Sequence, residues 1–354
     1  MNLNKFYGVL MSKNIELAKI EAGLITHVYR AELLPLFIVR TNNLEGWLKK
    51  RAIDNHRTNS RLLKKALRLS EKDDVSTVLS VNAVTITDTY WVKETGSELT
   101  WEDVRFKDDV FANLALKGDL SALSILPSRS PEATNIGSFE KCWKIENGEW
   151  WLHKRANQYE LFSELFIYYL GKELGFPMAH YEKTDDGIRS RDFTNHASVN
   201  YEAAFGWMGE EEDYVANYDW LVNVSTDLAD RYVELLILDA ICRNGDRHTG
   251  NYGILRDVDS GAIIGMAPNF DNNIALVYNG DLSTPRKPDL LGRLLQELES
   301  ERAAVSKYLS RNMMPKLTEE MVDRCIDKTQ IDIDRDYIKT FIRVGYEQLP
   351  QKLI

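Results

Sequence analysis

The chain contains few cysteines, and those it has form no recognisable pattern. Cys142, Cys242 and Cys325 are the 3 cysteines among 354 residues, and no two of them form a Cys-x-x-Cys pair. An odd number of widely spaced cysteines favours neither a disulfide framework nor a structural zinc site.

Long apolar runs and an excess of basic charge are also lacking. No apolar segment approaches the ~20 residues that span a bilayer, and the N-terminal segment lacks the apolar core of a signal peptide. With 54 acidic and 44 basic residues, the formal net charge is -10. This balance does not favour binding along a nucleic-acid backbone. We expect a cytoplasmic protein whose direct partners include neither nucleic acid nor a membrane.

The length and composition indicate a globular protein with two parts. Hydrophobic residues make up 44% and charged residues 28%, as in ordinary globular chains, and the length allows two domains or one two-lobed domain. Pro127, Pro131 and the surrounding serines predict a loop-rich linker. We place a boundary near residue 125, between a mixed α+β region (1–125) and a second domain (126–354).

The N-terminal region carries no catalytic pattern and is interpreted as a regulatory or partner-binding part. Capping residues and an apolar stripe predict a helix from Asn59 to Leu69. Ala83–Val92 alternates and is rich in β-forming residues, which predicts a strand. Asp109–Leu116 is typical of a short helix that ends before Gly118.

The second domain begins with a hairpin and a helix. Asn147-Gly148 favours a tight turn between strands Phe139–Glu146 and Glu149–Arg155. Gln158–Leu174 has a helical apolar stripe and is followed by Gly175 and Pro177, which end helices. A second hairpin is predicted from Met178–Thr184 and Ile188–Phe193. Mostly helical sequence follows from Leu221, with short strands near Tyr252 and Ile263.

A constellation of acids and amides follows one apolar helix. The segment Leu236–Leu255, LILDAICRNGDRHTGNYGIL, places Asp246, His248 and Asn251 in a polar loop, and Asp271 follows the next apolar strand. Phosphoryl transfer from Mg-ATP requires an acid that accepts the acceptor's proton, together with an amide and an acid that hold the metal. The alternative interpretation is a polar loop whose residues only make turns.

Candidate nucleotide-binding residues precede this loop. Lys154 lies near the end of the second hairpin strand, on the same face as Trp150, with Arg155 on the opposite face. A helix carboxylate could orient it toward the phosphates, and Glu164 is preferred over Glu160 for this role. Backbone amides of a loop that includes Gly137 and Ser138 could cover the phosphates, although a plain loop fits equally well.

The motifs NGDRHTGN, APNFD and SELFIYYLGKELGF resemble those of HipA-like kinases over roughly residues 130–310. These are atypical Ser/Thr protein kinases, related to phosphoinositide kinases, and several are bacterial toxins. The resemblance implies a bilobal, protein-kinase-like α+β fold, with an N-lobe at 126–193, a hinge near Arg191–Asn195 and a C-lobe at 194–354. It also implies ATP and Mg²⁺ as cofactors, a Ser/Thr protein substrate and a possible cognate antitoxin or regulatory protein.

The resemblance also assigns roles to individual residues. Asp246 would be the catalytic base, Asn251 and Asp271 the metal ligands, and Lys154 the phosphate-binding lysine. The family commonly has lysine where this chain has Gly250. That departure removes a positive charge near the γ-phosphate and could leave this role to His248.

Two other functions remain open on the same scaffold. One is a kinase that phosphorylates a small molecule or a phosphoinositide. The chain departs from phosphoinositide kinases because Asn272 and Asn273 follow Asp271 where those enzymes have Phe-Gly. The other is a catalytically silent pseudokinase that acts as a binding module.

Overall fold

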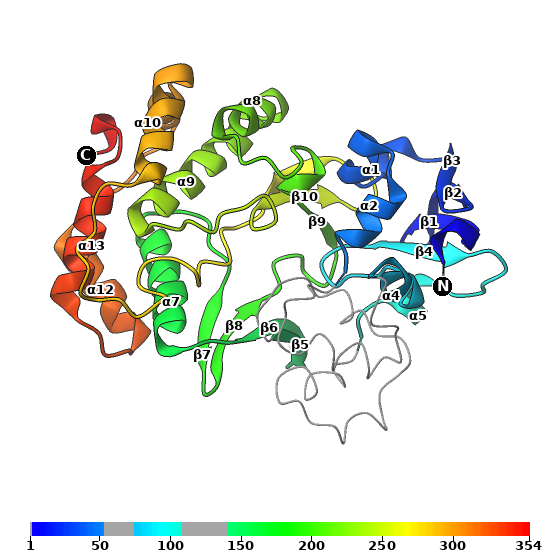
Figure 1. Ribbon diagram of the computed structural model, residues 1–354, viewed down its shortest axis with the longest axis horizontal. Coiled ribbons are helices and arrows are strands. Elements are labelled where there is room, and N and C mark those ends of the chain that lie inside the picture. Colours follow the sequence, from blue (N-terminus) through cyan, green and yellow to red (C-terminus); the bar gives the residue numbers. More distant parts are fainter. Residues whose placement is uncertain (1, 53–73, 108–140) are drawn as a thin grey trace. The chain divides into compact units, whose positions relative to one another are not determined.

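The computed structural model describes residues 2–52, 74–107 and 141–354 (Figure 1). Within it the chain divides into two compact units. Unit 1 comprises Met1–Arg155, Arg189–Glu202 and Ile254–Ile264, and unit 2 comprises Ala156–Ile188, Ala203–Gly253 and Gly265–Ile354.

Several predicted features lie outside the described residues. They are the two N-terminal helices (Asn59–Leu69 and Asp109–Leu116), the linker with the boundary near residue 125, and the loop with Gly137 and Ser138. These features, and the division into domains, stay predictions.

A four-stranded sheet forms much of the N-terminal part of unit 1. Its strands are β1 (Gly8–Ser12), β2 (Ile15–Glu21), β3 (Leu24–Val28) and β4 (Tyr90–Glu94), in the order β3-β2-β1-β4. β1 pairs with β2 and β4 in antiparallel register, and β2 pairs likewise with β3. Within residues 2–52 and 74–107, the short helices that accompany this sheet are α1 (Leu36–Thr41), α2 (Leu44–Lys49), α4 (Asp74–Ser80) and α5 (Trp101–Val104).

The predicted strand Ala83–Val92 is wrong in its bounds, because β4 begins only at Tyr90 and extends to Glu94. The preceding segment binds the buried side chain of Arg51 instead of a neighbouring strand. Arg51 donates hydrogen bonds to the backbone oxygens of Ala83 and Tyr90, and its guanidinium pairs with Asp88 at 2.8 Å. The alternating sequence of Ala83–Val92 indicates β propensity, but it does not reveal that an arginine distant in sequence binds the backbone of this segment.

A second buried arginine joins this part of unit 1 to a three-stranded sheet. The sheet has the order β11-β10-β9 and contains β9 (Val199–Ala203), β10 (Gly253–Asp257) and β11 (Ile263–Met266). Arg256 of β10 pairs with Glu202 of β9 and donates to the backbone oxygens of Leu34 and Glu32, at 2.8 and 2.7 Å. The N-terminal segment is therefore fixed to β9 and β10 by a buried charge network.

The predicted first hairpin is confirmed. β5 (Lys141–Glu146) and β6 (Glu149–Arg155) pair in antiparallel register, and Asn147 and Gly148 both have positive φ angles, 54° and 82°, as the tight turn requires. They belong to a sheet of order β5-β6-β8-β7, with β7 (Tyr181–Thr184) and β8 (Gly187–Arg191).

The predicted helix Gln158–Leu174 is confirmed as α7 (Gln158–Glu173). Asn157 and Glu160 form a capping box at its start, and Gly175, with a φ of 81°, follows its end.

Unit 2 is otherwise helical around one buried helix, α9 (Thr226–Cys242). The helix α9 contacts α7, α8, α10, α11 and α13 (Figure 1). These helices and α12 have the following bounds: α8 Tyr214–Val224, α10 Leu290–Arg302, α11 Ala304–Arg311, α12 Glu319–Thr329 and α13 Arg335–Glu347.

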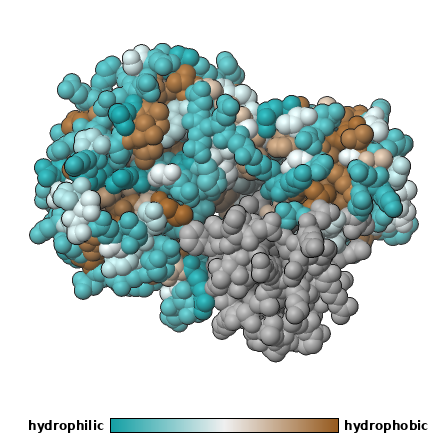
Figure 2. Space-filling model, in the orientation of Figure 1, coloured by the Kyte–Doolittle hydropathy of each residue, from teal (hydrophilic) through white to brown (hydrophobic). Residues whose placement is uncertain are grey.

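The face of the molecule drawn in Figure 2 is mostly hydrophilic, with scattered hydrophobic patches, as is usual for a folded chain. Among the described residues, no helix has the length and apolar character needed to cross a bilayer.

Replacing Gly261 by alanine should destabilise unit 1. Gly261 has a φ of +71°, and an added Cβ would lie 1.9 Å from the backbone oxygen of Glu32. A non-glycine residue in such a conformation costs ~1–3 kcal/mol before any clash. Urea unfolding measures the loss. Gly265→Ala is the matched control, because its Cβ would meet nothing within 4 Å; equal losses in both variants would contradict this account.

Candidate active site

The predicted catalytic loop follows the buried helix α9. The helix ends at Cys242, and Arg243 takes a left-handed conformation with a φ of 55°, which turns the chain away from the helix axis. Arg286 donates to the last backbone oxygens of the helix, including that of Ala240, so that acceptors without intrahelical partners are satisfied. Asp246 and Asn251 lie in the loop between this helix end and β10.

Arg247, which the sequence did not single out, holds this loop to the one that contains Asp271. Its guanidinium is buried and pairs with Asp239 of α9, with N–O distances of 2.9 and 3.1 Å. It also donates to the backbone oxygens of Asn251 and Phe270, at 2.8 and 2.7 Å.

The side-chain oxygens of Asn269 and Asn272 complete the set of acceptors around this guanidinium. They lie 3.1 and 2.6 Å from its Nη2 atom. One side chain therefore fixes the backbone on both sides of the site. The only sequence signal is an arginine directly after the candidate base, beyond an apolar helix that contains one aspartate.

Asn251 and Asp246 lie within hydrogen-bonding distance of each other. The Nδ2 atom of Asn251 donates to the backbone oxygen of Asp246 at 3.1 Å. This bond occupies the nitrogen end of the amide, so the Oδ1 atom is the end that can bind a metal. Burial raises the pKa of Asp246, and the negative charge of Asp271 adds to the rise. A raised pKa makes a carboxylate a better proton acceptor.

Asp271 is held in an unusual backbone conformation by α7 and β7. Its φ of 60° lies in the left-handed region, which is uncommon for residues other than glycine. Its N–H donates to the hydroxyl oxygen of Tyr181 at 3.0 Å, and the next N–H, of Asn272, donates to Oε1 of Glu164 at 2.8 Å. Glu164 and Tyr181 are buried, with exposures of 0% and 2%.

Glu164 and Tyr181 also interact with each other. The tyrosine hydroxyl is hydrogen-bonded to the Glu164 carboxylate, and burial together with this carboxylate raises the pKa of Tyr181 well above its ordinary value. The hydroxyl therefore stays protonated, donates to Glu164 and accepts from Asp271. The sequence predicted Glu164 as the partner of Lys154 and gave no reason to select Tyr181.

The predicted site residues are divided between the units. Asp246, His248, Asn251, Asp271 and Glu164 belong to unit 2. Lys154 belongs to unit 1, where it is buried while Arg155 is exposed. The pairing of Lys154 with Glu164 stays a prediction.

His248 is oriented by Gly250, the residue at which the chain departs from the HipA-like pattern. The backbone N–H of Gly250 donates to Nδ1 of His248 at 3.0 Å. In the neutral ring this bond leaves the proton on Nε2. A Cβ at residue 250 would lie 2.8 and 2.9 Å from two ring atoms, so this ring position requires glycine. The catalytic role of His248 stays a prediction.

Several carboxylates of unit 2 act on Arg247 or on one another. The charges of Asp239, Asp271 and Glu164 all act on Arg247, and Asp246 faces Asp271. No group of three His, Cys, Asp or Glu side chains within the described ranges could hold a metal alone.

Comparisons with known proteins show which fold the chain has. No protein-family model and no curated protein matches the sequence. Solved structures do match, and the fold they define is a kinase-like α+β fold. HipA of Shewanella oneidensis MR-1, from a toxin–antitoxin system complex with HipB and operator DNA, matches with a TM-score of 0.59 and 10% identity, covering 96% of each chain.

The chain therefore has the HipA fold, which confirms the predicted fold class and the resemblance on which it rested. A Helicobacter pylori proinflammatory kinase, CtkA, is also similar, with a TM-score of 0.43 and 16% identity, over 59% of this chain and 90% of that chain.

Removing the partner of Arg247 should strongly destabilise unit 2. Asp239→Ala leaves a buried guanidinium without its counter-ion, for which we expect a loss of ~3–5 kcal/mol in urea unfolding. Asp219→Ala is the control, because Asp219 pairs with Arg302 at 2.7 Å but its side chain is 44% exposed. The control should change little. If both variants unfold at the same urea concentration, the Asp239–Arg247 pair does not support the loops as described.

Proposed function

We propose that this protein is a HipA-like kinase that transfers the γ-phosphoryl group of ATP, with Mg²⁺, to a Ser or Thr hydroxyl of a protein. The observation that carries the proposal is the Arg247 clamp. It holds the backbone of Asn251 and Phe270 to one buried side chain, and so brings the predicted base and both predicted metal ligands into one rigid part of unit 2. Phosphoryl transfer depends on such positioning and on charge, more than on covalent chemistry by the protein.

Each residue has a defined task in this proposal. Asp246 accepts the proton of the acceptor hydroxyl, and its raised pKa suits that task. Asn251 and Asp271 hold the metal through oxygen atoms, the ligands that Mg²⁺ prefers. Lys154 contacts the phosphates of ATP. When bound, Mg²⁺ neutralises the charge of the phosphate oxygens.

The gathering of carboxylates in unit 2 supports the metal assignment. Asp246, Asp271 and Glu164 add three negative charges to the Asp239–Arg247 pair, which is neutral as a whole. A divalent cation between such carboxylates would offset their mutual repulsion. Gly137 and Ser138 are proposed to cover the phosphates, on the sequence alone.

We also infer that a cognate antitoxin or another regulatory protein binds this chain. With a cognate antitoxin as its partner, the chain would be a toxin. The support is the likeness in fold to HipA, which was solved together with HipB. The acidic net charge of -10 makes anionic membrane lipids less attractive as substrates. A protein acceptor is therefore preferred over a phosphoinositide or a small molecule.

Asp246→Asn should abolish phosphoryl transfer while it leaves nucleotide binding intact. Loss of a general base typically lowers the rate by ~10²–10⁴-fold. Radiolabelled ATP with Mg²⁺ measures labelling of the chain and of added proteins, and calorimetry measures nucleotide binding. Asp259→Asn, at an exposed position, is the control.

Three results of this experiment would contradict the proposal. Equal labelling by wild type and Asp246→Asn would show that the assigned base is wrong. Labelling of inositol lipids but not of protein would favour a lipid kinase. Binding of ATP without turnover over a range of divalent metals would favour a pseudokinase.

Tyr181→Phe should weaken the response to Mg²⁺. The variant removes the oxygen that accepts the N–H of Asp271, and loss of a residue that orients a metal ligand typically costs ~10–100-fold in metal affinity. A titration of labelling rate against Mg²⁺ at saturating ATP measures the shift.

Tyr168→Phe is the matched control for this titration. Tyr168 is also a buried tyrosine, and its ring contacts that of Tyr181, but its hydroxyl contacts His180. Equal Mg²⁺ dependence in the two variants would show that the Tyr181 hydroxyl does not position Asp271.

A further inference from the structure

The carboxylate of Asp246 is accessible, although the backbone of this residue is fixed. Its N–H donates to Oδ1 of Asn244 at 3.2 Å, and its backbone oxygen accepts from the N–H of His248 at 2.8 Å and from the side chain of Asn251 at 3.1 Å. The side chain is half-buried, and none of the described residues donates a hydrogen bond to its carboxylate. A hydroxyl that approaches this side chain therefore meets a proton acceptor that is held in place and whose oxygens no neighbouring side chain occupies.

Buried residues hold the loop on both sides of Gly245 and Asp246. Asn244 and Arg247 have exposures of 1% and 5%. The Nδ2 atom of Asn244 donates to Oδ1 of Asn272 at 3.2 Å, and the same oxygen accepts from Arg247 at 2.6 Å. Between these two anchors Gly245 is exposed, so the surface beside the base is formed by a residue without a side chain.

Neither conformation nor packing requires glycine at residue 245. Its φ angle is not positive, so it does not adopt the left-handed conformation that favours glycine. A Cβ added to Gly245 would meet no described atom within 4 Å, whereas a Cβ added to Gly250 of the same loop would lie 2.8 Å from the ring of His248. Where the backbone accepts a Cβ, alanine normally stabilises the fold relative to glycine, because the unfolded chain then loses less entropy. The fold alone therefore does not explain Gly245.

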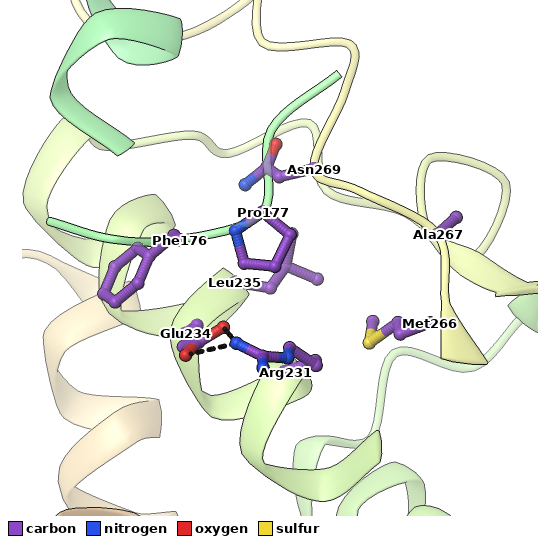
Figure 3. Close-up of a pocket in the computed structure, with 8 residues that line it drawn as sticks. All are labelled: Phe176, Pro177, Arg231, Glu234, Leu235, Met266, Ala267 and Asn269. Carbon is purple, nitrogen blue, oxygen red and sulfur yellow. Dashed lines mark hydrogen bonds and ion pairs between the residues drawn. The ribbon is translucent and has the colours of Figure 1, made fainter. Parts of the chain in front are cut away.

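The pocket drawn in Figure 3 does not provide a place for an acceptor. Its cavity volume is ≈ 20 Å³, which holds about one water. Figure 3 shows the ion pair between Arg231 and Glu234 on the wall formed by α9. The rest of the lining is mostly apolar and comprises Phe176, Pro177, Leu235, Met266 and Ala267. Neither Gly245 nor Asp246 lines this pocket, so an acceptor has to approach the base from the surface of the loop.

We propose that the protein acceptor approaches Asp246 over Gly245, and that its main chain occupies the space that a side chain at residue 245 would fill. This inference rests on the proposed kinase function. The hydroxyl of a serine or threonine is only two bonds away from its own Cα atom. It can therefore reach the Asp246 carboxylate only if the acceptor's backbone also comes close to the loop, and glycine allows such a close approach.

The transfer step gives the acceptor and Asp246 defined tasks. The acceptor oxygen forms a bond to the γ-phosphorus of ATP while the bond between that phosphorus and the bridging oxygen of ADP breaks. The hydroxyl proton passes to the Asp246 carboxylate, and ADP leaves. Gly245 takes no part in this chemistry, so its effect is on the position of the acceptor alone.

Gly245→Ala and Gly245→Leu test this approach in the full chain. The acceptor probe is a synthetic peptide mixture in which serine or threonine is flanked by random residues, and radiolabelled ATP measures transfer to it. We expect the apparent KM for the peptides to rise ~10-fold in Gly245→Ala, the effect of about one methylene group in a substrate site, and further in Gly245→Leu. The KM for ATP should not change, and the urea midpoint of Gly245→Ala should stay equal or rise. A purely structural role of Gly245 would lower the urea midpoint instead of separating the two KM values.

Gly265→Leu is the matched control, because its added Cβ also meets nothing within 4 Å, and it should label the peptides as wild type does. Peptides with homoserine, whose hydroxyl is one methylene further from the backbone, should lose less in Gly245→Leu than serine peptides do. Undiminished serine labelling by Gly245→Leu, or an equal rise in both KM values, would refute the approach over Gly245 and leave the proposed kinase function intact. If wild type labels no peptide, or labels no better than Asp246→Asn, the proposed function fails and this inference fails with it.

Discussion

The site in unit 2 depends on one buried ion pair, between Arg247 and Asp239. Removing a guanidinium from water is unfavourable by several kcal/mol. Pairing with a single carboxylate offsets this desolvation penalty only when the remaining N–H donors of the guanidinium also find acceptors. Here they do, in the backbone oxygens of Asn251 and Phe270 and in two asparagine side chains. The same bonds that make burial of the charge tolerable also fix the two loops, so stability and positioning have one physical cause.

Glu164 and Tyr181 apply the same principle on the other side of the Asp271 loop. A buried carboxylate accepts one N–H directly and is hydrogen-bonded to a tyrosine that accepts the preceding N–H. Backbone donors satisfied in this way allow Asp271 to keep a left-handed conformation, which is otherwise unfavourable by ~1–3 kcal/mol. For Asp271 as the proposed metal ligand, being held from both sides by buried groups means that little reorganisation is needed to bind an ion, as expected of a site that acts by electrostatic stabilisation.

Local rules explain which parts could be predicted from the sequence. The Asn147-Gly148 turn and the capped helix α7 each follow from a few adjacent residues, and both are confirmed. Tyr181 and buried arginines such as Arg51 and Arg247 escaped prediction because most of their partners are distant in sequence and their residue types are common on surfaces. A buried arginine leaves no periodic signal. For the same reason, the strand predicted at Ala83–Val92 is wrong in its bounds, because Arg51 binds the backbone of this segment.

Gly250 illustrates how one small residue changes the chemistry available to the loop. A lysine at this position would bring a mobile cation, but its Cβ would lie 2.8 Å from the ring of His248, so the ring could not stay where it is. With glycine, the backbone N–H reaches Nδ1 of the ring, and in its neutral form the imidazole then has one donor, at Nε2. A neutral donor stabilises a phosphate less than an ammonium group does.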